Sequence, residues 1–161
     1  MLRSNLLPYG FFDWCESMPL GNSIKQAMWA FAVIESVHIM ALAILLGTMI
    51  VIDLRLLGIG MKRMPVAELA KLLSPWFWWS FAGMVVTGTC LFMAEAIHLS
   101  TSGPFAYKIV LVLLAVAVHL TLHRKAIANN IDGAAIGKFA AYLSLACWLG
   151  IALAGRAIAF L

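Results

Sequence analysis

Residues 30–58, AFAVIESVHIMALAILLGTMIVIDLRLLG, form an apolar run long enough to cross a membrane. A helix needs about 20 such residues to span the roughly 30 Å hydrocarbon core of a bilayer. The run nevertheless contains Glu35 and His38, three positions apart. Ionisable side chains are costly inside a membrane, so this pair indicates a function as well as a fold.

The rest of the chain has the same apolar character. Of its 161 residues, 64% are hydrophobic and only 11% are charged, whereas charged residues make up about 25% of soluble domains. Lipid offers the backbone no water, and long unbroken apolar runs favour spanning helices over a barrel. The sequence predicts an all-α, four-helix transmembrane bundle that forms a single domain over residues 1–161. The expected spans are residues 24–57, 75–99, 104–128 and 137–161.

Capping and breaking residues support these limits. Asn22 and Ser23 are expected to cap the first span, Pro75 and Pro104 suit first helical turns, and Gly58 is a breaker. Two flanking segments are predicted to lie on the membrane surface. They are the aromatic N-terminal segment and a short amphipathic helix on the inner face, MKRMPVAELAKLL, residues 61–73.

Basic residues predict the orientation, because cytoplasmic loops of membrane proteins hold an excess of lysine and arginine. The connections after the first and third spans hold Arg55, Lys62, Arg63, Lys71, Arg124, Lys125 and Lys138. Both termini are therefore expected outside, in a bacterial inner membrane. Topology accounts for most of the net charge of +4, so the expected surroundings are the lipid bilayer and no nucleic acid.

All four histidines, His38, His98, His119 and His123, fall in or at the end of a predicted span. His38 lies 15 residues after Ser23, and His119 lies 15 residues after Pro104. At about 1.5 Å per residue, each should lie ~22 Å along its helix, at one level in the membrane. His123 is expected one turn deeper on the same face as His119.

Two imidazoles at one depth on different helices suit the axial positions of a single b-type haem. His38 is one predicted ligand, and the other is His119 or His123, a choice that the sequence leaves open. Histidines used only for packing are the alternative, although each would need its own polar partner. Candidate partners for the haem propionates are Arg55, Arg124, Arg156 and Lys108.

The glutamates allow a competing metal site. Glu35 and His38, and again Glu95 and His98, form E-x-x-H motifs, which are half of a ferritin-like dinuclear signature. The two motifs differ in expected depth by ~15 Å, and the third and fourth spans supply no further acid. Glu35 is therefore predicted to act as a proton relay beside the haem.

The first helix and its exit, SVHIMALAILLGTMIVIDLRLLG (36–58), resemble a group of small bacterial four-helix membrane proteins. The similarity continues through PWFWWSFAGMVVTGTCLF (75–92) and YKIVLVLLAVAVHLTLHRK (107–125). More loosely, the chain resembles copper-resistance D type membrane domains and the four-helix cytochrome b561 class. That resemblance implies His38 and one of His119 or His123 as haem ligands. The chain lacks the widely spaced histidine pair of two-haem members, which favours one haem.

Taken together, these features predict a cytochrome b-type membrane protein. It would carry single electrons to or from quinone or a partner redox protein, and a homo-oligomer is a further expected form of association. Two alternatives stay open: a non-haem protein that handles a metal ion or protons along a path lined by His and Glu, and a structural membrane anchor.

Overall fold

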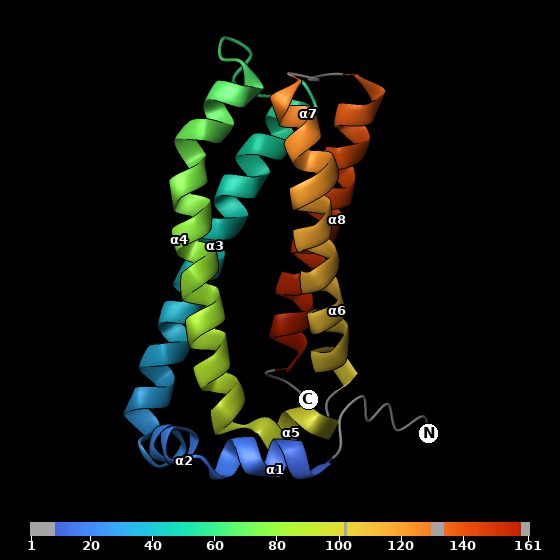
Figure 1. The fold of residues 1–161 in the computed structure, drawn as a ribbon. Helices are drawn as coiled ribbons and strands as arrows, with labels where there is room; N and C mark the ends of the chain where they lie inside the picture. The colour runs from blue at the N-terminus through green and yellow to red at the C-terminus, as the bar shows by residue number, and fades with distance from the viewer. Residues whose placement is uncertain (1–8, 102, 130–133, 159–161) are drawn as a thin grey trace.

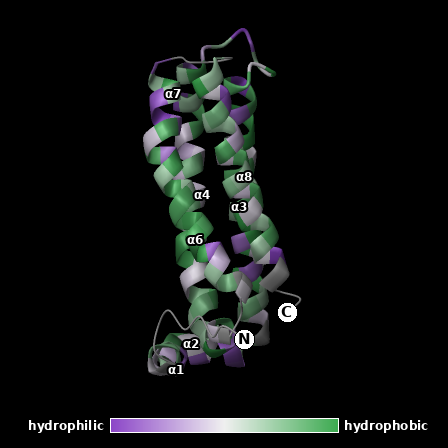
Figure 2. Ribbon diagram, turned by 90° about the vertical axis from the view of Figure 1, so that its right-hand side faces the viewer, coloured by the Kyte–Doolittle hydropathy of each residue, from purple (hydrophilic) through white to green (hydrophobic). Residues whose placement is uncertain are grey.

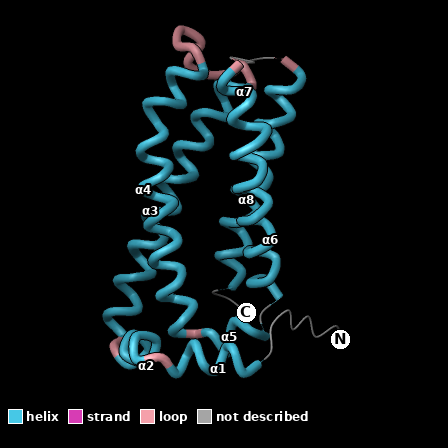
Figure 3. Tube along the Cα trace, viewed as in Figure 1, coloured by secondary structure: helices cyan, strands magenta, loops and turns pink. Residues whose placement is uncertain are grey.

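The chain folds into a helical bundle. In a computed structural model, residues 9–101, 103–129 and 134–158 are described, and they contain helices joined by short connections, with no strand (Figure 3). Four helical segments in these ranges are long and apolar enough to cross a membrane. The predicted all-α, four-helix transmembrane class is therefore confirmed. Residues 1–8, 130–133 and 159–161, which belong to the expected N-terminal segment, third connection and end of the fourth span, lie outside the described residues.

The long helices form two pairs, α3 with α4 and α6 with α8, and α8 also packs against α3 (Figure 1). They comprise α3 (Met28–Leu56), α4 (Val66–Ala94), α6 (Gly103–Val118), continued by the π-helical turn η1 (His119–His123) and α7 (Arg124–Ala128), and α8 (Ala135–Ile158). Three short helices lie across one end of the bundle, which we call the α1 end: α1 (Tyr9–Ser17), α2 (Pro19–Gln26) and α5 (Ala96–Thr101). The opposite end carries the α3–α4 connection, and we call it the basic end.

Apolar residues cover the long helices, whereas polar residues gather near the two ends (Figure 2). Large apolar side chains such as Val86, Leu113 and Leu153 are more than 60% exposed. A helix with apolar side chains on every face is typical of a membrane span, because lipid and not water surrounds it. The protein is therefore a multi-pass membrane protein.

The first spanning helix starts later than the sequence predicts. Asn22 and Ser23 lie inside α2, and the chain turns at Ala27, whose ψ of 86° is not helical, before α3 begins at Met28. The segment before Ala27 is polar, and its Ser23, Lys25 and Gln26 are exposed. Continuing straight into the membrane would bury these groups in lipid, so the chain bends at the surface instead.

The second spanning helix starts earlier than predicted. Pro75 lies inside α4, which begins after Pro65. The surface helix predicted in residues 61–73 is not a separate element. Its residues from Val66 onward form the first turns of α4, in which Val66 and Leu69 are buried. A proline within a spanning helix removes one backbone donor, which membrane helices tolerate when neighbouring groups satisfy the freed carbonyl.

Gly58 ends α3 as expected. Its φ is 79°, the left-handed conformation that glycine adopts without steric cost. The Gly58 N–H bonds to the Arg55 carbonyl and the Ile59 N–H to the Leu54 carbonyl, which is the Schellman pattern of a helix C-terminus. Arg55 then donates from Nε to the Met64 carbonyl and ties the connection back to the helix.

Buried apolar clusters fill the middle of the bundle and the basic end. The central cluster includes Leu45, Met49, Phe77, Ala115, Cys147, Trp148 and Ile151. The cluster at the basic end includes Ile52, Leu56, Val66, Ala126, Ala140 and Ala141. A third, smaller cluster of Phe12, Cys15 and Ala96 joins α1 to α5. Between the central cluster and the α1 end, a cavity separates the two helix pairs.

Glu16 connects the short helices at the α1 end. Its carboxylate accepts bonds from Lys25 of α2 and from the Ile97 N–H of α5, the latter at 2.9 Å. Burial alone would raise the pKa of Glu16, but these hydrogen bonds and the Lys25 charge hold it below its usual value. The resulting stabilisation is present above the pKa of an unfolded glutamate and is lost as the pH falls through the folded pKa.

Candidate functional site

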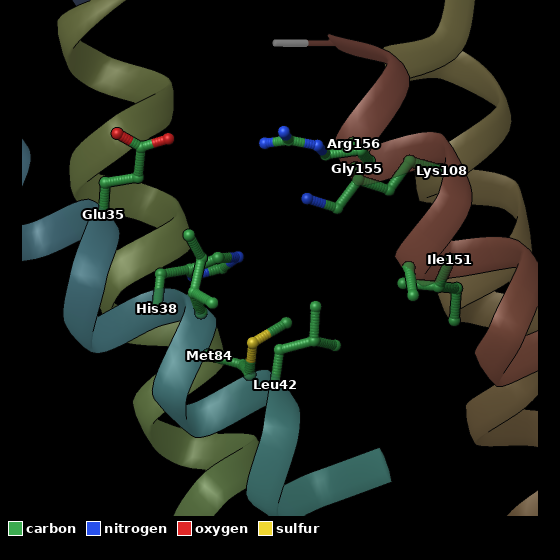
Figure 4. Close-up of a pocket in the computed structure, with 10 residues that line it drawn as sticks. Glu35, His38, Leu42, Met84, Lys108, Ile151, Gly155 and Arg156 are labelled. Carbon is green, nitrogen blue, oxygen red and sulfur yellow. The ribbon is translucent and has the colours of Figure 1, made fainter.

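The cavity near the α1 end holds an unusual set of side chains for a membrane interior. Its enclosed volume is about 150 Å³. Four helices line it, with Glu35, His38, Ile39 and Leu42 from α3, Met84 from α4, Lys108 from α6, and Ile151, Ala152, Gly155 and Arg156 from α8. Figure 4 shows Glu35 and Arg156 on the side towards the α1 end, and Leu42, Met84 and Ile151 deeper in the bundle. The part of the cavity nearer the α1 end, which we call the cavity mouth, is therefore polar, and the part deeper in the bundle is apolar.

His38 points from α3 into this cavity (Figure 4), and α4 holds its ring in place. Its Nδ1 lies 2.8 Å from the Thr87 hydroxyl, which itself donates to the Gly83 carbonyl at 2.6 Å. A hydroxyl has one proton, and the Gly83 carbonyl has none to give, so Thr87 must accept from His38. Neutral His38 therefore carries its proton on Nδ1, and the Nε2 lone pair is available to a ligand.

Gly88 lets the His38 ring lie against α4. A Cβ atom at position 88 would come within 3.2 Å of His38 Cε1, closer than side chains normally pack. The Thr87–Gly88 pair thus supplies both the hydrogen bond and the space that the ring needs. Buried metal-binding histidines are commonly oriented in this way, by a hydrogen bond to the ring nitrogen that faces away from the metal.

Cationic groups face His38 across the cavity. Lys108 extends from α6 over Gly155, where a Cβ would lie 3.5 Å from its Nζ. Within the described residues, no hydrogen bond or ion pair reaches this ammonium group. Arg156 lines the same cavity one residue further along α8. The Lys108 ammonium at this depth would be stabilised by an anionic ligand, because lipid offers it no counter-charge.

His119 does not join His38. It stacks on Phe77 with ring centroids 4.3 Å apart, whereas His38 bonds to Thr87. Phe77 and Thr87 both lie on α4, ten residues apart, which is about 15 Å of helix. The expected common level is therefore wrong. The count for the first span began at Ser23 and α3 begins at Met28, which accounts for about half of this separation at 1.5 Å per residue.

His123 lies still closer to the basic end, where it pairs with Asp53. His123 Nε2 and Asp53 Oδ1 are 2.8 Å apart, and neither side chain has any exposed surface. The sequence analysis did not single out Asp53 as a site residue. A signal was present, since Asp53 follows Leu45 and Met49 at intervals of four on the buried face of α3.

The remaining predicted site residues are spread over the molecule. Glu35 and Arg156 line the cavity with His38, whereas Arg55 and exposed Arg124 lie at the basic end. Glu95 and His98 are exposed near the α1 end. Among the described residues, no group of three or more His, Cys, Asp or Glu side chains is placed to hold a metal ion. The dinuclear arrangement therefore finds no support in the described part of the chain.

Comparison with known proteins adds a family but no activity. No curated protein and no solved structure matches the chain significantly. One family pattern matches residues 11–161, which include every helix from α2 to α8 and most of α1. The chain belongs to this family, DUF6644, a family of unknown function.

Proposed function

We propose that the protein is a membrane cytochrome that binds one b-type haem in the cavity, with His38 as an axial ligand, and carries single electrons. One observation carries the proposal. Thr87 holds His38 Nδ1–H, so that the basic Nε2 faces a cavity at membrane depth. The resemblance to histidine-containing membrane domains of the copper-resistance D and cytochrome b561 classes supports the same ligand.

The other cavity residues suit the parts of a haem. Leu42, Met84 and Ile151 provide apolar contacts for a macrocycle, and Lys108 and Arg156 provide charges for its propionates. The enclosed volume of about 150 Å³ is below the ~300–1,000 Å³ of typical small-molecule sites. Haem binding here would therefore require the α3–α4 and α6–α8 pairs to move apart.

Bound haem would supply a one-electron redox centre. Of the uncharged side chains that line the cavity, Met84 is the one besides His38 with an atom that could bind the iron of a haem. His–Met ligation raises the reduction potential of a haem, and two occupied positions favour electron transfer over oxygen chemistry. Exposed Glu35, one turn before His38 on α3, is placed to exchange protons with a quinol or with solvent at the cavity mouth.

The distribution of basic residues supports an orientation. Arg55, Lys62, Arg63, Lys71, Arg124 and Lys125 all lie at or near the basic end. The positive-inside rule then places this end in the cytoplasm of a bacterium and the cavity in the outer half of the inner membrane. We propose quinone or an external redox protein as the electron-transfer partner, because either could reach the cavity mouth.

A proton path is the second candidate function. It is favoured by Glu35 and His38, which line one cavity a single turn apart on α3. Such a path would need no haem. The two functions are therefore distinguished by whether the purified protein binds haem with a defined stoichiometry.

Thr87→Val should weaken haem binding by roughly 10- to 100-fold, the usual effect of losing the hydrogen bond that orients a histidine ligand. Valine has nearly the same shape as threonine but cannot accept the Nδ1 proton. Thr89→Val is the matched control, because the exposed Thr89 hydroxyl bonds only to the Val85 carbonyl of its own helix. Titration of haem-depleted protein with haem, followed by absorbance, measures both affinities. Equal affinities for the two variants would contradict the role of Thr87.

A further inference from the structure

A second polar cluster lies between the central core and the basic end, separate from the cavity. Among the described residues, five buried side-chain atoms have no hydrogen-bond partner: Asp53 Oδ2, His119 Nδ1, His123 Nδ1, Ser144 Oγ and Trp148 Nε1. Buried polar atoms are almost always paired in folded proteins. Five exceptions in one region require an explanation.

These five atoms belong to contiguous side chains. The His119 and His123 rings lie 5.2 Å apart in the π-helical turn, and Asp53 bonds to His123. Ser144 lies beside Asp53, and Trp148 follows it one turn later on α8. The π-helical turn itself is a feature often found at functional sites.

In no protonation state of the Asp53–His123 pair do the described residues supply a hydrogen-bond partner for every polar atom of the two side chains. The hydrogen bond between Asp53 Oδ1 and His123 Nε2 contains one proton, which is bonded covalently to one of these two atoms. If His123 is neutral and donates from Nε2, its Nδ1 lacks a donor, whether or not the neighbouring Ser144 hydroxyl donates to the carboxylate. If Nδ1 is protonated, it lacks an acceptor. In each case at least one polar atom needs a further partner, and internal water is the molecule that usually supplies it.

Few titratable or charged groups of the described residues lie near the Asp53–His123 pair. On α3, Arg55 is directed to the Met64 carbonyl. On η1 and α7, the titratable or charged groups are His119 and the exposed Arg124, and on α8 the buried thiol of Cys147. The α4 residues that pack here, Phe77 and Trp78, are not charged. Asp53 and His123 are in direct contact with each other, Nε2 to Oδ1 at 2.8 Å.

We propose that Asp53 and His123 form a hydrated proton-binding site, in which internal waters join the pair to His119, Ser144 and Trp148. Uptake of one proton takes the pair from a net charge of −1 to zero, with the added proton on a carboxylate oxygen or on His123 Nδ1. Asp53 lies three residues before the end of α3, and exposed Arg124 follows His123 directly. Protons therefore exchange with the basic end. This site does not depend on the haem proposal.

Infrared spectroscopy of the purified full-length protein in detergent tests the site. A pH titration should change the Asp53 bands, either because the carboxylate becomes a carboxyl group or because it bonds to a newly protonated His123, and the changed band should shift in D₂O. The signal should be lost entirely in Asp53→Asn and retained in Glu68→Gln, which removes an exposed carboxyl of α4 instead. An Asp53 band that is unchanged with pH, or that does not shift in D₂O, would overturn the proposal in favour of a dry structural pair.

A measurement on the wild-type protein covers the case in which Asp53→Asn does not fold. Nitrogen NMR of histidine-labelled protein reports the protonation of every imidazole nitrogen. A buried histidine that changes its protonation with pH and exchanges its ring proton with solvent supports the site. Retention of one tautomer, without exchange, by every histidine other than the exposed His98 and the cavity residue His38 would overturn it.

Discussion

His38→Ala is expected to abolish stable haem binding, with an affinity at least ~100-fold below that of the wild type. The substitution removes an axial ligand, which is a larger loss than the 10- to 100-fold effect of disturbing its hydrogen-bonded neighbour. The alanine also leaves Thr87 and Gly88 without the ring that they hold. Haem content per purified chain, measured after extraction, checks this result.

Two histidine variants serve as controls for His38→Ala. His119→Phe keeps an aromatic ring against Phe77 and removes a buried nitrogen that has no partner. His98→Gln changes an exposed residue of α5. Both should retain haem at the wild-type level. Loss of haem in His119→Phe, with His38→Ala still red, would mean that the ligand is in the inner cluster and not in the cavity.

Asp53→Leu and His123→Leu should each destabilise the protein by about 3–5 kcal/mol, the cost of leaving one member of a buried ionisable pair without its partner. Both side chains are fully buried, so the group that remains is not exposed to bulk solvent. Thermal or denaturant unfolding in a single detergent gives the free-energy changes.

The double variant Asp53→Leu/His123→Leu isolates the pair. It leaves no buried ionisable group without its partner, so it should be more stable than either single variant. Replacement of buried ion pairs by apolar residues in other proteins has often been neutral or stabilising. Additive losses in this double-mutant cycle would show that the two side chains do not interact energetically.

The sequence was sufficient for the fold because membrane spans follow from length and hydropathy alone. It placed α6, η1 and α7 to within a residue or two, since Pro104 and the polar residues after Ala128 mark both limits. It misplaced the start of α3, because nothing local distinguishes Ala27 from a helical residue. The bend there reflects tertiary placement of α2 on the surface, where Gly21 packs against the Met93 backbone.

That error accounts for about half of the distance between the levels of His38 and His119. His38, Glu35, Arg156 and Lys108, which share the cavity, could be predicted from the sequence because ionisable residues are rare in apolar helices. His119 and His123 were predicted as site residues too, but His119 lies about 15 Å from His38 along the bundle and His123 lies further still. Which histidines meet depends on helix tilt and on relative vertical position, and neither is encoded in spacing along one helix. Thr87 and Asp53 were missed as partners, since hydrogen bonds between helices require coordinates.

The central claim is that His38 presents its Nε2 to a haem in the cavity. The most direct measurement is the reduced-minus-oxidised absorption spectrum of the purified wild-type protein, with haem extracted and quantified from the same sample. The account predicts a b-type spectrum and one haem per chain. Folded protein that remains colourless after incubation with haem would contradict it.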